Sequence, residues 1–280
     1  SVASPDICVI TNIGVAHLEF FKTREGILQE KSQMIQDMKD GGTIILNGDD
    51  DLLSQMGPVK GVAPEFFGTT PDNDVYADNI EPQGLKGTAC TIHLPDGSQF
   101  DCVVPVPGIH MVSNALAGAS VGYALELTPD EIKAGIEGLP SIPGRNHIIK
   151  TDKIIVLDDC YNANPISMKA SVDVLNMAIG RKVAILGDMG ELGEEASELH
   201  REVGEYAAQK GIDVVCAIGS VSKALADGAK AEGCTEVHWF ETKKEFLDTY
   251  KDIILPGDNV LVKASHGMAF PEIVDALQTL

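Results

Sequence analysis

The stretch IIVLDDCYNANPISM, residues 154–168, places two carboxylates, a tyrosine and two asparagines directly after an apolar run. Asp158 and Asp159 could accept hydrogen bonds from sugar hydroxyls, and Asn164 followed by Pro165 is typical of a helix start. Such a polar cluster suits the rim of a ligand site. The alternative is that both carboxylates are solvated loop charges near a helix N-terminus, where acids are favourable.

Lys31 stands out because a helical wheel places it inside an apolar arc. The arc is formed by Ile27, Met34, Ile35 and Met38. The lysine therefore points toward the expected core. Either its stem packs while its ammonium reaches water, or it is a functional lysine open to covalent modification. His17 lies a few residues past a predicted strand, and together with Lys31 it could face a metal.

Three further segments carry polar groups or glycines that could serve a site. Asn114 lies in the first turns of a predicted helix, where asparagine is intrinsically poor, so it could be a cap or a ligand contact. Arg145 follows a segment rich in proline and glycine, and could reach a phosphate or form an interdomain ion pair. GDMGELG, residues 187–193, lacks the spacing of phosphate-binding glycine motifs and is typical of a turn.

From about residue 148 the sequence alternates short β-branched runs with amphipathic helical segments. This order predicts a parallel, doubly wound α/β sheet, in which ligands bind beyond the carboxyl ends of the strands. The helix after Pro165 and the helix over residues 194–210 should each pack one face on the sheet. The expected faces are Met168, Val172, Leu175 and Ile179 in the first, and Ala196, Leu199, Val203 and Tyr206 in the second.

The first half has a different order of elements. The pattern predicts strands over residues 6–11 and 42–47, a helix over 23–38, a hairpin over 88–106 and two later helices. The second of these helices begins with a capping box in which Thr128 is the cap and Glu131 its partner. The segment GLPSIPGR separates the halves, so we predict domains at residues 1–143 and 144–280.

The composition is that of a globular chain with room for two domains, with 280 residues, 44% hydrophobic and 22% charged. A formal net charge of −21 argues against nucleic acid or an anionic membrane as a partner, while small phosphorylated ligands stay possible. No apolar run approaches the roughly 18 residues of a membrane-spanning helix, and the start lacks the features of a signal peptide. We therefore expect a cytoplasmic protein.

The six cysteines are scattered and form no CxxC pair, so we expect reduced, mostly buried thiols and no zinc site. Cys90 and Cys102 flank the turn PDGS almost symmetrically and could face each other across the predicted hairpin. Nothing in the sequence indicates an oxidising compartment, so we expect no disulfide between them.

The sequence resembles the Mur ligases of peptidoglycan synthesis. The matching segments run in family order along almost the whole chain and are ITNIGVAHLE, GILQEKSQMI, LNGDDD, GIHMVSNALAG, PGRN, DDCYNANPISM, LGDMGELG and LVKASHGM. DDCYNANP and LGDMGELG are most similar to the branch that joins D-alanyl-D-alanine to UDP-N-acetylmuramoyl-tripeptide. The resemblance implies an α/β fold, with a truncated Mur ligase central ATPase domain followed by a Rossmann-like doubly wound C-terminal domain.

The resemblance also implies an ATP-dependent amide synthesis with ATP and Mg2+ as cofactors. The γ-phosphoryl group passes to the tripeptide carboxylate, and the amine of the dipeptide then attacks the acyl phosphate and releases phosphate. His17 looks like the magnesium-ligating histidine of the family. Lys31 looks like its carbamoylated lysine, whose new carboxylate helps hold a second magnesium. Asn114 matches the residue near adenine.

In the second half, Arg145 is similar to the phosphate-contacting arginine of the family and Asp159 to the acid that binds ribose hydroxyls. Tyr161 and Asn162 would line the nucleotide beside it. Lys263 and Ser265 match the segment that faces the incoming dipeptide. This chain departs from the family pattern at three positions near these residues, with Cys160 in place of serine, Ala264 in place of glycine and His266 in place of arginine.

The sequence contains no G-K-[ST] motif, whose amides and lysine grip the β- and γ-phosphates in this family. The N-terminal domain that binds the UDP moiety has no counterpart either. We therefore expect a C-terminal fragment that does not catalyse ligation by itself. An exposed edge of its shortened sheet would favour dimerisation.

Two other functions stay open from the sequence. One is a related amide ligase that adds a single amino acid, either another Mur ligase or a folylpolyglutamate synthase. The other is a nucleotide-binding module without catalysis, because residues 145–280 alone have a Rossmann-like order of elements. The missing GxGxxG motif counts against a dinucleotide as its ligand.

Overall fold

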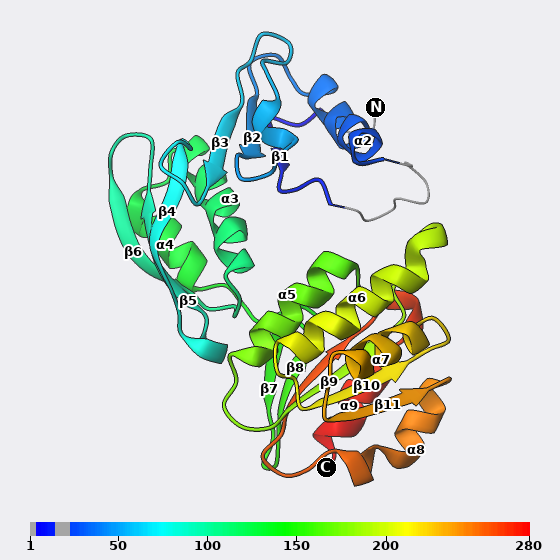
Figure 1. The fold of residues 1–280 in the computed structure, drawn as a ribbon. Coiled ribbons are helices and arrows are strands. Elements are labelled where there is room, and N and C mark those ends of the chain that lie inside the picture. Colours follow the sequence, from blue (N-terminus) through cyan, green and yellow to red (C-terminus); the bar gives the residue numbers. More distant parts are fainter. Residues whose placement is uncertain (1–3, 15–22) are drawn as a thin grey trace. The chain divides into compact units, whose positions relative to one another are not determined.

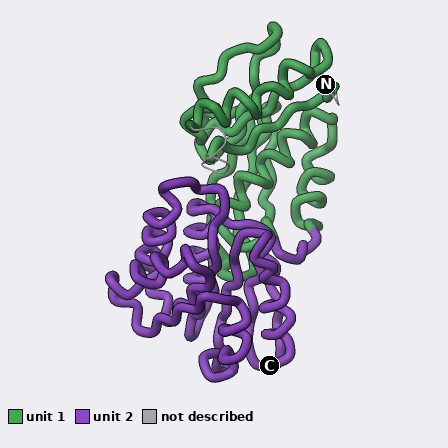
Figure 2. Tube along the Cα trace, turned by 90° about the vertical axis from the view of Figure 1, so that its right-hand side faces the viewer, with its two compact units in different colours: residues 1–139 green, residues 140–280 purple. Residues whose placement is uncertain are grey.

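The structure of the protein is a computed structural model, which describes residues 4–14 and 23–280. The chain divides into two compact units, unit 1 over residues 1–139 and unit 2 over residues 140–280 (Figure 2). Compactness alone does not fix a domain boundary, so the predicted boundary between residues 143 and 144 stays a prediction. Each unit is built around its own sheet.

In its described part, unit 1 has a sheet of strand order β1-β2-β3-β4-β5-β6. The strands are β1 (Ile7–Ile10), β2 (Thr43–Asn47), β3 (Glu65–Gly68), β4 (Val75–Pro82), β5 (Thr88–His93) and β6 (Gln99–Val104). Neighbouring strands from β1 to β4 pair in parallel, whereas the pairs β4–β5 and β5–β6 are antiparallel. The helices are α2 (Arg24–Gln36), α3 (His110–Ala124) and α4 (Pro129–Glu137), with short 3-10 turns η1 (Leu53–Gln55) and η2 (Gly84–Lys86).

The sheet of unit 1 is covered on both faces. Successive side chains of β2 point alternately into two different cores. Ile45 belongs to the core that includes α3 and α4, whereas Ile44 and Leu46 belong to the core that includes α2. This alternation is the period of two that a strand imposes. Parallel strands covered on both faces are expected to read as continuous apolar runs, as TIILN does.

Several local predictions for the first half are confirmed. The predicted hairpin is the antiparallel pair β5–β6, in which Cys90 and Cys102 are register partners. Helix α4 begins with the predicted capping box of Thr128 and Glu131. Along the whole chain, the expectation of mostly buried cysteines is also confirmed, since each of the six is buried except the half-buried Cys234.

Unit 2 has a sheet of strand order β11-β10-β9-β12-β8-β7. The strands are β7 (His147–Lys150), β8 (Ile155–Asp158), β9 (Lys182–Gly187), β10 (Val214–Ile218), β11 (Glu236–Phe240) and β12 (Asn259–Lys263). All neighbours pair in parallel except β7, which forms an antiparallel hairpin with β8. The helices are α5 (Pro165–Asn176), α6 (Ala196–Gln209), α7 (Ser222–Ala231), α8 (Lys243–Ile253) and α9 (Pro271–Gln278), with 3-10 turns η3 (Gly193–Glu195) and η4 (His266–Met268).

Helices cover both faces of the unit 2 sheet, so the predicted doubly wound fold is confirmed. Figure 1 shows α5, α6 and α7 on one face and α8 and α9 on the other. Val183 and Ile185 of β9 pack with Phe246 of α8 and Ile273 of α9 in one core. The alternating residues of the same strand are also fully buried, which requires the second helical layer. Among the described residues, no helix combines the length and apolar character that crossing a membrane demands.

The predicted apolar faces of two helices in unit 2 need correction. Helix α5 ends at Asn176, so Ile179 lies beyond it and is 97% exposed. Helix α6 buries His200, Val203, Gly204 and Ala207, whereas Ala196, Leu199 and Tyr206 are only half-buried. The face is shifted because α6 packs closely on α7: a Cβ at Gly204 would lie 1.9 Å from the carbonyl oxygen of Leu225. Glycine there permits the contact.

The N-terminus of α5 gives a first testable prediction. Asn164 Oδ1 accepts a hydrogen bond from the Ser167 amide at 2.9 Å, and Ser167 Oγ accepts one from the Asn164 amide at 3.1 Å. We expect Asn164→Ala to lower the free energy of unfolding by about 1 kcal/mol, because one helix amide loses its acceptor. Asn164→Asp is the matched control, since it keeps the acceptor and should cost a few tenths of a kcal/mol at most. Urea unfolding measures both, and equal losses would contradict the capping role.

Candidate functional site

The loops that follow β8, β9 and β12 meet at one edge of the unit 2 sheet, because these strands are parallel neighbours. Asp159 follows β8, Asp188 follows β9 and Ser265 follows β12. Ligands of doubly wound sheets bind at this edge. Five of the predicted site residues lie on these loops or at the strand end that leads into them, namely Asp159, Tyr161, Asn162, Lys263 and Ser265.

A buried ion pair joins the first and last of these loops. The Lys263 ammonium lies 2.5 Å from Asp159 Oδ2, and the two residues are 3% and 7% exposed. Ser171 of α5 donates to the same oxygen at 2.6 Å, and the Asn146 amide donates to Oδ1 at 3.0 Å. A buried charge needs an opposite charge and hydrogen bonds. Here Lys263 and Asp159 are each other's charged partner.

Lys263 also organises the backbone of the loop after β8. Its ammonium donates to the carbonyl of Asn162 at 3.0 Å and lies 3.4 Å from the carbonyl of Asp159. An ammonium has three hydrogens, and these two carbonyls with the Asp159 carboxylate provide three acceptors. The Lys263 ammonium therefore points into the loop after β8.

The exposed ring of Tyr161 contacts the side chains of Arg145 and His266. The Arg145 guanidinium carbon lies 3.8 Å from the centre of the Tyr161 ring. The His266 ring is tilted against the same tyrosine, with 5.5 Å between the ring centres. Tyr161 is 50% exposed, and its amide donates to the Gly144 carbonyl at 3.1 Å. The three side chains thus form an aromatic and cationic surface that suits a planar, anionic ligand.

The interpretation of Asp158 and Asp159 as solvated loop charges is wrong. Asp158 is 5% exposed; its Oδ2 accepts from the Gly144 amide at 2.7 Å and its Oδ1 from the Cys160 amide at 3.3 Å. Both carboxylates are therefore bound to the backbone around them. Burial, together with the neighbouring Asp158, raises the pKa of the Cys160 thiol well above its ordinary value, so this cysteine stays protonated and unreactive.

The loop after β9 is held from two further elements. Asp188 Oδ1 accepts from the amide and the hydroxyl of Ser222, at 2.7 Å each. The Asp188 carbonyl accepts from the Ser265 amide at 3.1 Å, and the Gly190 amide donates to Ser265 Oγ at 2.7 Å. The glycine-rich stretch GDMGELG is thus a rigid turn that shares two hydrogen bonds with the loop after β12.

His200, which sequence reasoning missed, supports the same turn from α6. The fully buried ring accepts a hydrogen bond from the Met189 amide through Nε2 at 2.8 Å. Its Nδ1 lies 2.6 Å from the Ala196 carbonyl, which can only accept, so Nδ1 carries the hydrogen. Burial lowers the pKa of His200 and keeps the ring neutral. The available signal was its spacing of three and seven residues from the buried Val203 and Ala207.

In unit 1, the prediction that Lys31 points toward the core is wrong. Ile27, Ile35 and Met38 are buried, but Lys31 is exposed and Met34 is 37% exposed. The ammonium donates to the carbonyl of Asn12 at 2.8 Å. Partial burial of the ammonium in this position lowers the pKa of Lys31, against an opposing attraction from Asp50.

The segment Asn12–Ile13 beyond β1 is held by Asp50 of LNGDDD and by Arg24 of α2. Asp50 Oδ2 accepts from the Ile13 amide at 2.7 Å, and Arg24 donates to the Ile13 carbonyl at 3.0 Å. The Arg24 guanidinium also pairs with both carboxylate oxygens of Asp51. Lys31 therefore lies beside a well-supported loop at the carboxyl edge of β1 and β2.

Of the other two predicted residues of unit 1, Asn114 alone lies within the described part of the chain. His17 lies outside the described residues. Asn114 is exposed in α3 and donates to Met111 Sδ at 3.4 Å. It is the fifth residue of the helix, and the first turn has Ile109 as its cap residue, so the predicted capping role is wrong. In the part of the chain that is described, no group of three or more His, Cys, Asp and Glu side chains is arranged to hold a metal ion.

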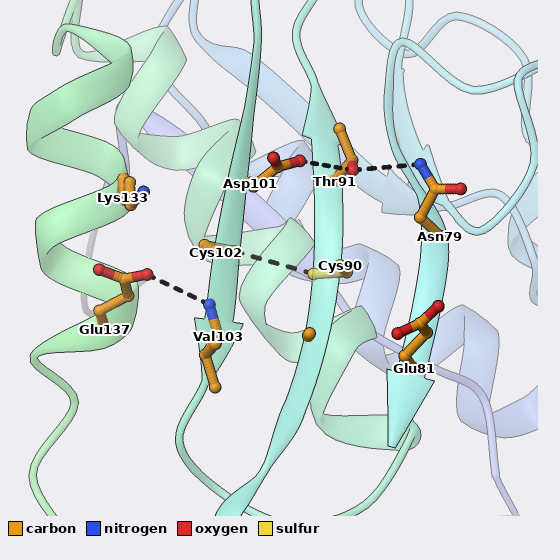
Figure 3. Close-up of a pocket in the computed structure, with 10 residues that line it drawn as sticks. Asn79, Glu81, Cys90, Thr91, Asp101, Cys102, Val103, Lys133 and Glu137 are labelled. Carbon is orange, nitrogen blue, oxygen red and sulfur yellow. Dashed lines mark hydrogen bonds between the residues drawn. The ribbon is translucent and has the colours of Figure 1, made fainter. Parts of the chain in front are cut away.

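Unit 1 also has a shallow groove that none of the predicted site residues line (Figure 3). It has a volume of about 490 Å³ and runs across β4, β5 and β6 beside α4. Asn79 donates to Thr91 at 3.3 Å, and Thr91 donates to Asp101 at 2.7 Å, so its central polar groups bind one another. The sulfur atoms of Cys90 and Cys102 lie 3.8 Å apart as free thiols. We assign no ligand to this groove.

The buried ion pair predicts a large difference between two lysines of unit 2. Lys263→Met should lower the free energy of unfolding by about 3–5 kcal/mol, because it leaves the Asp159 carboxylate buried without a cation. The control is Lys169→Met, which breaks the pair with Glu202 whose side chains are 32% and 45% exposed, and should cost less than about 1 kcal/mol. Similar losses in urea unfolding would contradict the central role of the pair. The double variant Lys263→Met, Asp159→Asn should lose less than the sum of the single variants.

His200 predicts a pH dependence of stability. Because its folded-state pKa is lowered, the ring contributes stability above its unfolded pKa of about 6.5, and this stability is lost as the pH falls through the folded-state pKa. We expect the free energy of unfolding to fall less steeply from pH 7 to pH 5 in His200→Gln than in the original protein. Val203→Ala is the control, because it removes buried packing from the same helix without removing a titratable group, and it should not flatten the slope. Parallel pH profiles of the original protein and His200→Gln would disprove a buried neutral ring.

Comparisons with known proteins agree across both units. The family model of the Mur ligase middle domain matches residues 1–122, and that of the Mur ligase glutamate ligase domain matches residues 144–266. A UDP-N-acetylmuramoyl-tripeptide–D-alanyl-D-alanine ligase of Bacillus subtilis is 34% identical over 99% of this chain and 60% of its own length. The ligase of the same name from Escherichia coli is 35% identical over 99% of this chain and 61% of its own length.

Solved structures give the same result. MurF from Acinetobacter baumannii superposes with a TM-score of 0.89 at 29% identity, over 99% of this chain and 60% of that protein. MurF from Thermotoga maritima, crystallised in complex with ADP, has a TM-score of 0.85 at 25% identity, over 99% of this chain and 62% of that protein. The chain thus spans about three-fifths of the length of these relatives. Two consecutive Mur ligase domains account for most of its residues, and the chain belongs to the Mur ligase family.

Proposed function

We propose that this chain is part of an ATP-dependent ligase that joins D-alanyl-D-alanine to UDP-N-acetylmuramoyl-tripeptide. The observation that carries the proposal is the match of 99% of the chain, at 34% and 35% identity, to two ligases that bear this activity in their names. The carboxyl edge of unit 2 supplies side chains that suit the nucleotide of such a reaction.

The surface formed by Arg145, Tyr161 and His266 is the proposed nucleotide contact. An exposed tyrosine offers a stacking face, and the guanidinium above it offers charge to a phosphate. Asp159 is held beside them. Its carboxylate has about four acceptor positions, and donors from Asn146, Ser171 and Lys263 occupy three of them. One position is left for a ribose hydroxyl.

We propose a positioning role for Lys263 in place of the predicted contact with the dipeptide. Its ammonium is buried and directed to Asp159 and Asn162, so a ligand could reach it only after the loop opened. Ser265 remains the better dipeptide contact. Its Oγ accepts from the Gly190 amide, which leaves its hydroxyl hydrogen for a carboxylate such as that of D-alanyl-D-alanine.

The proposed reaction draws its driving force from ATP, which supplies the phosphoryl group that activates the tripeptide carboxylate. The contribution of this chain is to orient the reactants and to balance their charge. Arg145 would bind phosphate oxygens, Asp159 would fix the ribose, and Ser265 would hold the dipeptide so that its amine meets the acyl phosphate. No proton transfer is assigned to these residues.

Magnesium is less well supported than ATP. The described residues alone do not offer a set of carboxylates and imidazoles for it, so the expected ligands His17 and Lys31 stay a prediction. A lowered pKa does increase the fraction of neutral Lys31 amine, which is the form that reacts with carbon dioxide to give a carbamate. Asn114 near adenine likewise stays a prediction.

A coupled ADP-release assay with UDP-N-acetylmuramoyl-tripeptide and D-alanyl-D-alanine tests the proposal. In the longest natural form of the protein that contains these residues, we expect ADP to form only when both substrates are present. The 280-residue chain alone should show no turnover, because its sequence lacks the G-K-[ST] motif. Arg145→Ala should raise KM for ATP about tenfold through the loss of a charge-assisted contact, whereas Lys169→Ala on α5 should leave it unchanged.

Two results, from this assay and from a measurement of NAD binding, would contradict the proposal. Turnover with a single amino acid in place of the dipeptide would indicate a related amide ligase. Absence of ADP release from the longest form, together with tight NAD binding, would indicate a nucleotide-binding module without catalysis. Turnover by the 280-residue chain alone would contradict only the expectation that this chain is inactive, because it would show that the missing motif is not required.

A further inference from the structure

The turn Asp188–Gly190 of unit 2 is attached to three separate elements. The Asp188 carboxylate is bound by Ser222 at the start of α7. The Met189 amide is bound by His200 of α6. The Asp188 carbonyl and the Gly190 amide are both bound by Ser265 in the loop after β12. The middle residue of the turn is therefore fixed by a histidine, and the residues on either side of it hold the serine.

Within the described part of the chain, His200 Nε2 is the acceptor of the Met189 amide. The ring is fully buried and uses its other nitrogen for Ala196 of the same helix, so its tautomer and its orientation are both fixed. An apolar side chain of similar size would pack on α6 equally well but would leave the Met189 amide without an acceptor. A buried imidazole is costly unless both nitrogens are bonded, which indicates a role beyond packing.

We propose that His200 is a positioning residue for the dipeptide site, acting through Met189 and Gly190 on the hydroxyl of Ser265. This inference rests on the proposed function, which makes Ser265 the contact for D-alanyl-D-alanine. Ser265 makes two hydrogen bonds with the turn: its amide donates to the Asp188 carbonyl, and its Oγ accepts from the Gly190 amide. A turn released at Met189 would let the Gly190 amide move, and Ser265 Oγ would lose the donor that orients its hydroxyl hydrogen.

The first experiment tests the attachment itself on the 280-residue chain, without any activity. Amide hydrogen exchange by NMR should show the Met189 amide exchanging at least tenfold faster in His200→Leu, relative to the amides of β9. His200→Gln keeps an acceptor near the position of Nε2 and should restore most of the protection. Unchanged protection in His200→Leu would overturn the proposal, since the turn would then hold without the histidine.

The second experiment separates positioning from general destabilisation, in the longest natural form of the protein. His200→Leu should raise KM for D-alanyl-D-alanine about three- to tenfold, the factor that one neutral hydrogen bond is worth, with kcat and KM for ATP within twofold. His200→Gln should recover most of this loss. Val203→Ala is the matched control, because it removes buried packing from the same helix without touching the turn.

A double-variant cycle with Ser265→Ala shows whether the two residues act together. If His200 acts through Ser265, then His200→Leu should add less than twofold to KM for the dipeptide in the Ser265→Ala background. Fully multiplicative effects, or an equal rise with Val203→Ala, would overturn the proposal. If the protein carrying the original residues shows no dipeptide-dependent ADP release, the proposed function fails, whatever the exchange of the Met189 amide shows.

Discussion

The carboxyl edge of unit 2 depends on one buried ion pair, formed by Lys263 at the end of β12 and Asp159 after β8. Neither charge could remain inside the protein alone, so the two loops must approach each other for the unit to fold. The approach also fixes the peptide groups of residues 159–162, because the ammonium binds two of their carbonyls. Stability and the shape of the proposed nucleotide site therefore come from the same contact.

At the same edge, buried carboxylates form hydrogen bonds with the backbone of neighbouring loops. Asp158, Asp159 and Asp188 all direct carboxylate oxygens at amides of neighbouring loops. Close approach of chain segments makes this possible. A Cβ at Gly219, for example, would lie 2.4 Å from the Asp188 carboxylate, and its φ of +119° also favours glycine. The side chains left exposed, Arg145 and Tyr161, stand on a rigid base, which is what a site that orients reactants requires.

The sequence predicted what local rules decide. The capping residues Asn164 and Thr128, the β5–β6 hairpin and the parallel order of unit 2 depend on neighbours within a few residues or on simple periodicity. It could not predict the burial of Lys263, whose partner Asp159 is 104 residues away. Periodicity also misplaced Lys31 and Ile179, because a helical wheel does not show where a helix ends or how far its face tilts. His200 was missed because it binds the amide of Met189, and only the fold brings the loop that contains Met189 next to α6.

The central claim is that the loops 144–146 and 159–162 of unit 2 form the adenine nucleotide contact. NMR chemical-shift mapping of the 280-residue chain with ADP tests it most directly, because binding can be weak and still be located. The account predicts the largest shifts at Arg145, Asp159 and Tyr161, with residues of β11, at the far edge of the sheet, unchanged. Shifts centred on another surface, or none at millimolar ADP, would contradict it.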